Sequence, residues 1–108
     1  MKLADLYTYR VTFSEEDQEY VGLCAELPSL SWLGKQREGA LTGIVNLVVE
    51  VLQDMEQSGE HQPVPFNNRE FSGELRIRIP PAVHRRLAIR AAEEKTSLNK
   101  LIVRELCA

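Results

Sequence analysis

Two stretches near the start of the chain alternate hydrophobic with polar residues, and an acidic turn separates them. Residues 7–13 and 19–25 are rich in aromatic and β-branched side chains, and this period of two predicts a β-hairpin. A shorter stretch, residues 30–34, follows Pro28 and ends at Gly34. Because proline and glycine interrupt the pattern on both sides, we expect a short third strand there.

The period of the pattern changes at Arg37. Apolar residues then recur every three or four positions, which predicts an amphipathic helix of about twenty residues that ends before Gly59. The following residues, 61–71, hold two prolines and two asparagines, and neither residue type favours the continuation of a helix. We therefore predict a linker here, with room for a short edge strand at residues 64–66.

Charged and apolar residues alternate again in the last third of the chain, at residues 74–79. This alternation predicts a strand with one charged face and one apolar face. Pro81 suits the first position of a helix, and Ser97 suits the N-cap of a second helix that runs through Leu106. One strand and two helices bury too little surface to fold alone, so we expect the strand to pair with the same strand of a second copy.

Together the patterns predict an α+β protein of two modules. The expected boundaries are residues 1–60 for the first domain, 61–71 for the linker and 72–108 for the second domain. The net charge of −3 hides a division, since residues 1–68 sum to −7 and residues 69–108 to +4. An acidic body joined to a basic module favours two partners of opposite charge.

Side chains that could carry chemistry are scarce. Cys24 and Cys107 lie far apart without a metal-binding spacing, and His61 and His84 are isolated, so we expect no catalytic residue, no metal and no cofactor. No apolar run approaches the roughly 18 residues of a membrane helix, and the N-terminus lacks a cleavage-site pattern. We expect a cytoplasmic protein that is not an enzyme and does not contact a membrane.

The charged residues of the last predicted strand are of the types that read DNA bases. Arginine offers two parallel donors to guanine, glutamate accepts from cytosine N4, and a two-stranded ribbon fits the major groove. The candidates are Glu74, Arg76 and Arg78. Taken singly, each is more often a solvated residue of an edge strand, but the combined pattern and the basic charge favour DNA binding.

The order of elements in residues 73–108 resembles that of the ribbon-helix-helix (Arc/MetJ-like) repressors. The shared features are an alternating strand, two prolines, a helix, a short turn, and Ser-Leu-Asn-Lys-Leu-Ile at the second helix start. The resemblance implies that Glu74, Arg76 and Arg78 read bases while the apolar strand residues form a dimer core. It also implies a phosphate anchor, because amide groups and the dipole at a helix start favour an anion. The anchoring positions are Thr96, Ser97, Leu98 and Asn99.

One position departs from the repressor pattern. Lys95 stands in the turn between the two helices, where that family commonly has glycine. A left-handed backbone at a residue other than glycine costs about 1 kcal/mol. The turn can bear this cost, so the departure does not change the predicted fold.

The first half of the chain, from Tyr9 to Leu41, resembles the HicB antitoxins. The matching features are Thr12-Phe13, the acidic turn, Leu27-Pro28, Trp32-Leu33-Gly34 and Ala40-Leu41. The resemblance implies a partial RNase H-like fold, β-β-β-α with one further strand allowed, that lacks nuclease activity and binds a HicA-like toxin. Such toxins are small basic ribonucleases that cleave mRNA, so an acidic body suits them. Where many members have Thr-Pro-Glu-Glu-Ala before the helix, this chain has Gln36-Arg37-Glu38-Gly39-Ala40.

Three residues are candidates for the toxin contact: Tyr20, Glu26 and Trp32. Aromatic side chains often anchor interfaces, but a lone tryptophan is more often part of a core, and Glu26 is more often a solvated carboxylate. The combined interpretation is an antitoxin that binds operator DNA as a homodimer and represses its own operon. The wide apolar face of the long helix also allows a tetramer.

Two alternatives stay open at this point. The first is a stand-alone ribbon-helix-helix repressor whose first domain senses a ligand or oligomerises. The second is a residual RNase H-like nuclease, although residues 7–13 hold no carboxylate that could bind magnesium.

Overall fold

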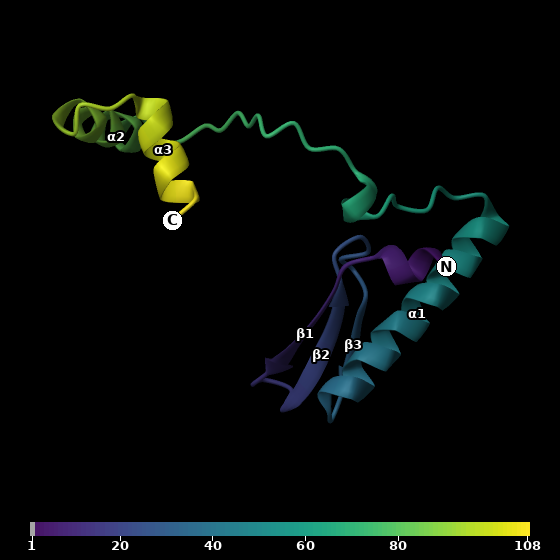
Figure 1. Cartoon of the computed structure of the whole chain (residues 1–108). Coiled ribbons are helices and arrows are strands. Elements are labelled where there is room, and N and C mark those ends of the chain that lie inside the picture. The colour runs from purple at the N-terminus through teal and green to yellow at the C-terminus, as the bar shows by residue number, and fades with distance from the viewer. Residues whose placement is uncertain (1) are drawn as a thin grey trace. The chain divides into compact units, whose positions relative to one another are not determined.

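The structure is a computed structural model that describes residues 2–108. It is an α+β protein with a three-stranded antiparallel sheet and three α-helices (Figure 1). The chain divides into two compact units, one that ends at Phe71 and one that spans Ser72–Ala108. Each unit is described by itself below.

The first unit holds the sheet. β1 (Tyr9–Ser14) and β2 (Glu19–Cys24) form an antiparallel hairpin, and β3 (Ser31–Gly34) pairs with the other edge of β2. The predicted hairpin and third strand are therefore confirmed, in the order β1-β2-β3. The finer comparison with an RNase H-like fold stays a prediction.

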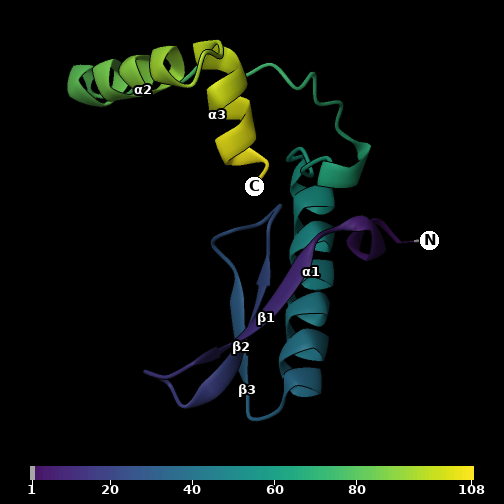
Figure 2. The same ribbon diagram turned by 60° about the vertical axis from the view of Figure 1, so that its left-hand side comes forward.

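One helix covers one face of this sheet. α1 (Arg37–Ser58) packs against all three strands, as Figures 1 and 2 show. It comes so close at Gly22 that an added Cβ would lie 2.5 Å from the carbonyl oxygen of Ala40. Ile44 and Val48 of this helix are fully buried, and burial of each such side chain contributes about 1.5–3 kcal/mol.

The predicted end of this helix is also confirmed. Gly59 follows Ser58 with a φ of 76°, and its amide donates to the carbonyl oxygen of Glu56. Glycine adopts this left-handed conformation at little cost, and its amide satisfies a carbonyl group at the end of the helix.

The prediction of an edge strand at residues 64–66 is wrong. The chain instead forms a 3-10 turn, η2, at Phe66–Asn68. Pro63 and Pro65 have no amide hydrogen to donate to a neighbouring strand, so the segment cannot complete a ladder. It packs against the first unit by other contacts, which are described below.

The second unit holds the two remaining helices. α2 (Pro81–Glu93) begins with Pro81 at its first position, and α3 (Leu98–Leu106) has Ser97 as its N-cap. Lys95 in the turn between them has a φ of 56°, which is the left-handed backbone that the sequence led us to expect.

Residues 74–79, predicted as a strand, form neither strand nor helix in this single chain. A strand needs a hydrogen-bonded neighbour, and the prediction gave that role to a second copy. Within residues 2–108, no helix is both long and apolar enough to cross a membrane.

Candidate functional site

The three predicted base-reading residues lie in the segment that precedes α2. Glu74, Arg76 and Arg78 are all exposed to solvent, so no other part of the second unit occupies their charged groups. Gly73, just before them, has a φ of 82°, and Pro80 and Pro81 fix the other end of the segment at the helix start. The segment is thus bounded by residues that restrict or redirect the backbone.

The apolar residues of the same segment are only partly covered. Leu75 is 83% exposed and Ile77 is 60% exposed, whereas Ile79 is half-buried. A groove of about 440 Å³ is lined by Ile77 and Ile79 together with Leu98 and Ile102 of α3. The segment therefore lies beside α3, and its apolar side chains leave surface that one chain does not bury.

The predicted phosphate anchors surround the start of α3. The Ser97 hydroxyl oxygen accepts a hydrogen bond from the Lys100 amide at 3.0 Å, so its own proton remains available to an acceptor. Ser97 and Asn99 are exposed, while Thr96 and Leu98 are half-buried. The predicted positions thus converge on one helix start, where amide groups can meet an anion.

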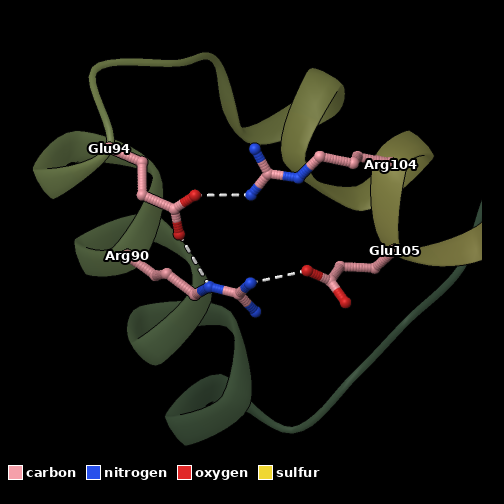
Figure 3. A network of polar contacts seen from close by, with 4 residues as sticks. All are labelled: Arg90, Glu94, Arg104 and Glu105. Carbon is pink, nitrogen blue, oxygen red and sulfur yellow. Dashed lines mark hydrogen bonds and ion pairs between the residues drawn. The ribbon is translucent and has the colours of Figure 1, made fainter. Parts of the chain in front are cut away.

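Four charged side chains join α2 to α3, as Figure 3 shows. Arg90 contacts Glu94 with Nε–Oε2 at 2.8 Å and Glu105 with Nη2–Oε1 at 2.6 Å, and Arg104 donates to the other oxygen of Glu94. The hydrogen bond from Arg104, followed by that from Arg90, holds the pKa of the Glu94 carboxyl below its usual value. The hydrogen bond to Glu94, followed by that to Glu105, raises the pKa of Arg90. The network ties the two helices together and so fixes the direction in which α3 begins.

The network leaves most of the basic charge of the second unit uncompensated. Arg90 and Arg104 are paired, but the other basic side chains of the unit have no ion pair among the described residues. These are Arg76, Arg78, Arg85, Arg86, Lys95 and Lys100. A surface with this charge attracts the phosphates of nucleic acids.

The comparison with protein families bears on this unit. Residues 57–106 match the HicB family model. The search of curated proteins and the search of solved structures each found no match.

The HicB match begins at the end of α1 and runs through α3. It includes the segment with Glu74, Arg76 and Arg78, both helices of the second unit, and the predicted phosphate anchors. The sheet of the first unit lies outside the matched range, so the HicB-like reading of Tyr9 to Leu41 stays a prediction. The ribbon-helix-helix assignment also stays a prediction, because the HicB match does not specify that fold.

Of the three residues predicted to contact a toxin, Trp32 is the one with a large open surface. Its side chain is 46% exposed, so the alternative that it forms part of the core is wrong. The indole lies against α1, where an added Cβ on Gly43 would come within 2.0 Å of its Cδ1 atom. Glycine at this position lets the ring rest on the helix backbone while its outer face stays in solvent.

Tyr20 is more occupied than Trp32. The Tyr20 ring meets the Phe13 ring edge-to-face at a centroid distance of 5.2 Å. The guanidinium group of Arg37, the first residue of α1, lies 4.8 Å from the centroid of the Tyr20 ring. Such contacts each stabilise a fold by about 0.5–1.5 kcal/mol. The half-buried Tyr20 therefore links the hairpin to the start of α1.

Glu26 is buried, with 6% of its surface exposed, so the alternative of an ordinary solvated carboxylate is wrong. Its Oε1 accepts from the Thr8 amide at 2.8 Å, and its Oε2 accepts from the Phe66 amide at 3.0 Å. Burial alone would raise the pKa of the Glu26 carboxyl, but these amide hydrogen bonds outweigh it and lower the pKa. The carboxylate is engaged inside the unit, and we do not place it on a partner surface.

The sequence did not single out the inward role of Glu26. A signal was present, because this carboxylate stands among the apolar residues of Cys24-Ala25-Glu26-Leu27-Pro28. Among residues 2–108, no group of three or more histidine, cysteine, aspartate or glutamate side chains could hold a metal ion.

Proposed function

We propose that this protein is an antitoxin that neutralises a HicA-like, mRNA-cleaving toxin and represses its own operon as a ribbon-helix-helix dimer. The HicB family match over residues 57–106 supports the antitoxin part of this proposal. In this proposal the first unit, a partial RNase H-like domain, covers the toxin, and the second unit binds operator DNA. The protein acts by binding and has no catalytic activity of its own.

The observation that carries the DNA-binding proposal is the segment at residues 74–79. Its charged residues are exposed, and Leu75 and Ile77 leave apolar surface uncovered beside α3. Antiparallel pairing with a second copy would satisfy the hydrogen-bonding groups of the backbone and bury these side chains. Burial of each side chain would stabilise the dimer by about 1.5–3 kcal/mol. The same pairing would place Arg76 and Arg78 on a ribbon of the width that enters the major groove.

The phosphate anchor positions this ribbon on the duplex. Thr96, Ser97, Leu98 and Asn99 surround a helix start whose amides and dipole favour an anion. Such contacts fix the register of the protein on DNA and carry no sequence information. In this proposal Glu74, Arg76 and Arg78 supply the base preference.

The toxin contact is proposed at the exposed face of Trp32. An indole held against a helix has few conformations to lose on binding, and tryptophan is enriched among residues that dominate interface energies. The charge of −7 over residues 1–68 suits a basic ribonuclease and would speed its association. Tyr20 supports the same surface from within the unit.

Replacement of an exposed apolar residue in the segment 74–79 tests the proposed dimerisation and the proposed operator binding together. We expect Ile77→Asp to abolish dimerisation and operator binding, because paired strands would bury two unpaired carboxylates. The control is Ala82→Asp, which adds the same single charge at an exposed position of α2. Sedimentation equilibrium and binding to the DNA upstream of the gene are the measurements. A dimer that survives Ile77→Asp would contradict the ribbon.

A stand-alone repressor with a ligand-sensing first unit is the second candidate. A groove of about 290 Å³ in the first unit favours it, with apolar walls from Leu3, Val49 and Leu52 and polar groups from Glu56 and Gln62. Grooves of this size can hold a small molecule. Under this alternative, a small molecule raises the melting temperature of the protein and no toxic neighbour gene exists.

A further inference from the structure

A buried carboxylate in the first unit joins two segments that are far apart in the sequence. Glu26 follows β2, Thr8 precedes β1, and Phe66 begins η2. The carboxylate accepts hydrogen bonds from the Thr8 amide at 2.8 Å, the Phe66 amide at 3.0 Å and the Thr8 hydroxyl at 3.2 Å. Because burial of a charge is costly unless hydrogen bonds compensate it, this carboxylate holds Phe66 firmly.

A second buried residue holds the same part of the chain. The Tyr7 hydroxyl donates to the carbonyl oxygen of Pro63 at 2.7 Å, and Tyr7 is only 5% exposed. Pro65, between the two contacts, is buried. At the near end, the Gln62 side chain donates to the carbonyl oxygen of Leu52 at 2.9 Å. Residues 62–66 are therefore docked on the first unit and are not a free linker.

We propose that Tyr7 and Glu26 are positioning residues that dock residues 62–66 and thereby set the length of the tether between the two units. With the segment docked, η2 stays with it, because the Arg69 side chain donates to the carbonyl oxygen of Val64 at 2.9 Å. Only residues 70–72 then remain as tether, which can span at most about 10 Å. If the segment were released, residues 60–72 would be free and could span about 45 Å. These two side chains thus shorten the reach of the tether about fourfold.

The length of the tether has a consequence that rests on the proposed function. A shorter tether raises the effective concentration of each unit at the binding site that the other unit occupies. Docking therefore couples the two binding events more strongly than a free linker would.

The test measures the distance between the units in the full chain, without toxin or DNA. Cys107 is exposed and Cys24 is buried, so spin labels can be placed at Cys107 and at an added Ser58→Cys. The labelled chain is diluted into an excess of unlabelled chain, so that each dimer carries one labelled copy. The test variant is Tyr7→Phe with Glu26→Gln. The control is Tyr9→Phe with Glu60→Gln.

The control is matched in chemistry. The Tyr9 hydroxyl also donates to a carbonyl oxygen at 2.7 Å, but its acceptor is Ala4 within the first unit, and Glu60 is an exposed carboxylate at the start of the segment. We expect the test variant to broaden the distance distribution and extend its upper limit by up to about 35 Å. The control variant should keep the distribution of the wild-type protein.

Hydrogen exchange at the Phe66 amide provides the second readout. We expect Glu26→Gln to lower its protection at least about tenfold, because a glutamine side chain cannot accept at both of its positions. An unchanged Phe66 amide would overturn the role of Glu26. A faster amide with an unchanged distance distribution would overturn the tether claim. If Glu26→Gln fails to fold, Tyr7→Phe alone decides by the distance distribution.

Discussion

Arg78 and Asn99 represent the two kinds of DNA contact in the proposed interface. Arg78→Ala should cost about 1–3 kcal/mol of operator binding and relax the base preference at one position, because arginine reads guanine through two parallel donors. Asn99→Ala should weaken binding to all sequences alike, since a phosphate contact carries no sequence information. Binding titrations with the operator and with random DNA, at one salt concentration, measure both effects.

Arg85→Ala is the control for the loss of a basic charge on the same unit. It should weaken binding without a change in base preference, as any non-specific cation does. If Arg78→Ala weakens binding to the operator and to random DNA by the same factor, Arg78 does not read bases.

Glu26 gives the protein a pH dependence whose sign follows from its hydrogen bonds. Its pKa is lowered in the folded protein from the ordinary value of 4.5, so its contribution to stability is present above that value and is lost as the pH falls through the folded pKa. Glu26→Gln removes this contribution at every pH. We therefore expect the stability difference between wild type and Glu26→Gln to be large at neutral pH and to shrink in acid.

Urea unfolding at neutral pH and at successively lower pH, followed by Trp32 fluorescence, measures this difference. Glu60→Gln serves as the control, because Glu60 is exposed and its replacement should change little. A difference for Glu26→Gln that stays constant from neutral to acid pH would show that the Glu26 carboxylate does not provide the stability.

Single residues differ in how far the sequence predicts their roles. Gly59, Lys95 and Ser97 act through local backbone rules, and the structure confirms the helix end, the left-handed turn and the N-cap. Glu26 and Trp32 depend on distant segments. The burial of Glu26 needs Phe66, which lies 40 positions away, and the exposure of Trp32 depends on the helix that follows it. No local pattern contains these contacts.

The two glycines of α1 test how the helix is seated on the sheet. An added Cβ at Gly39 meets no atom within 4 Å, whereas one at Gly43 would lie 2.0 Å from Trp32. Gly39→Ala should therefore stabilise the protein by about 0.5–1 kcal/mol through helix propensity. Gly43→Ala should destabilise it by about 1–3 kcal/mol, because the indole must leave the helix.

Thermal unfolding measures both changes, and Trp32 fluorescence should shift only in Gly43→Ala. The same substitution at two positions of one helix makes each the control of the other. Stabilisation by both substitutions would mean that Trp32 does not rest on the helix.

At the level of elements, the periodic pattern predicted the three helices and the three strands of the sheet well. It failed at residues 64–66, where two prolines remove the donors that a strand needs. Residues 74–79 form no strand in one chain, since pairing there depends on a second copy. The ion-pair network in Figure 3 was only partly predictable: Arg90 and Glu94 have helical spacing, but Arg104 and Glu105 come from another helix.

At the level of the whole molecule, the two units differ in charge and in completeness. The first unit is acidic and has a buried core around Ile44 and Val48. The second unit is basic and leaves Leu75 and Ile77 exposed. The difference in charge is a property of the sequence itself, which also predicts a linker over the whole of residues 61–71. In the structure, residues 62–66 are docked on the first unit, because Tyr7 and Glu26 bind their backbone.

The most direct test of the proposed function is co-expression of this chain with the small open reading frame next to its gene. We predict that the neighbour alone stops growth, that this chain restores growth, and that the two purify as a stoichiometric complex. Trp32→Ala should weaken the complex, while Arg78→Ala should leave it intact. A neighbour that is not toxic and does not bind this chain would contradict the antitoxin function and favour the stand-alone repressor.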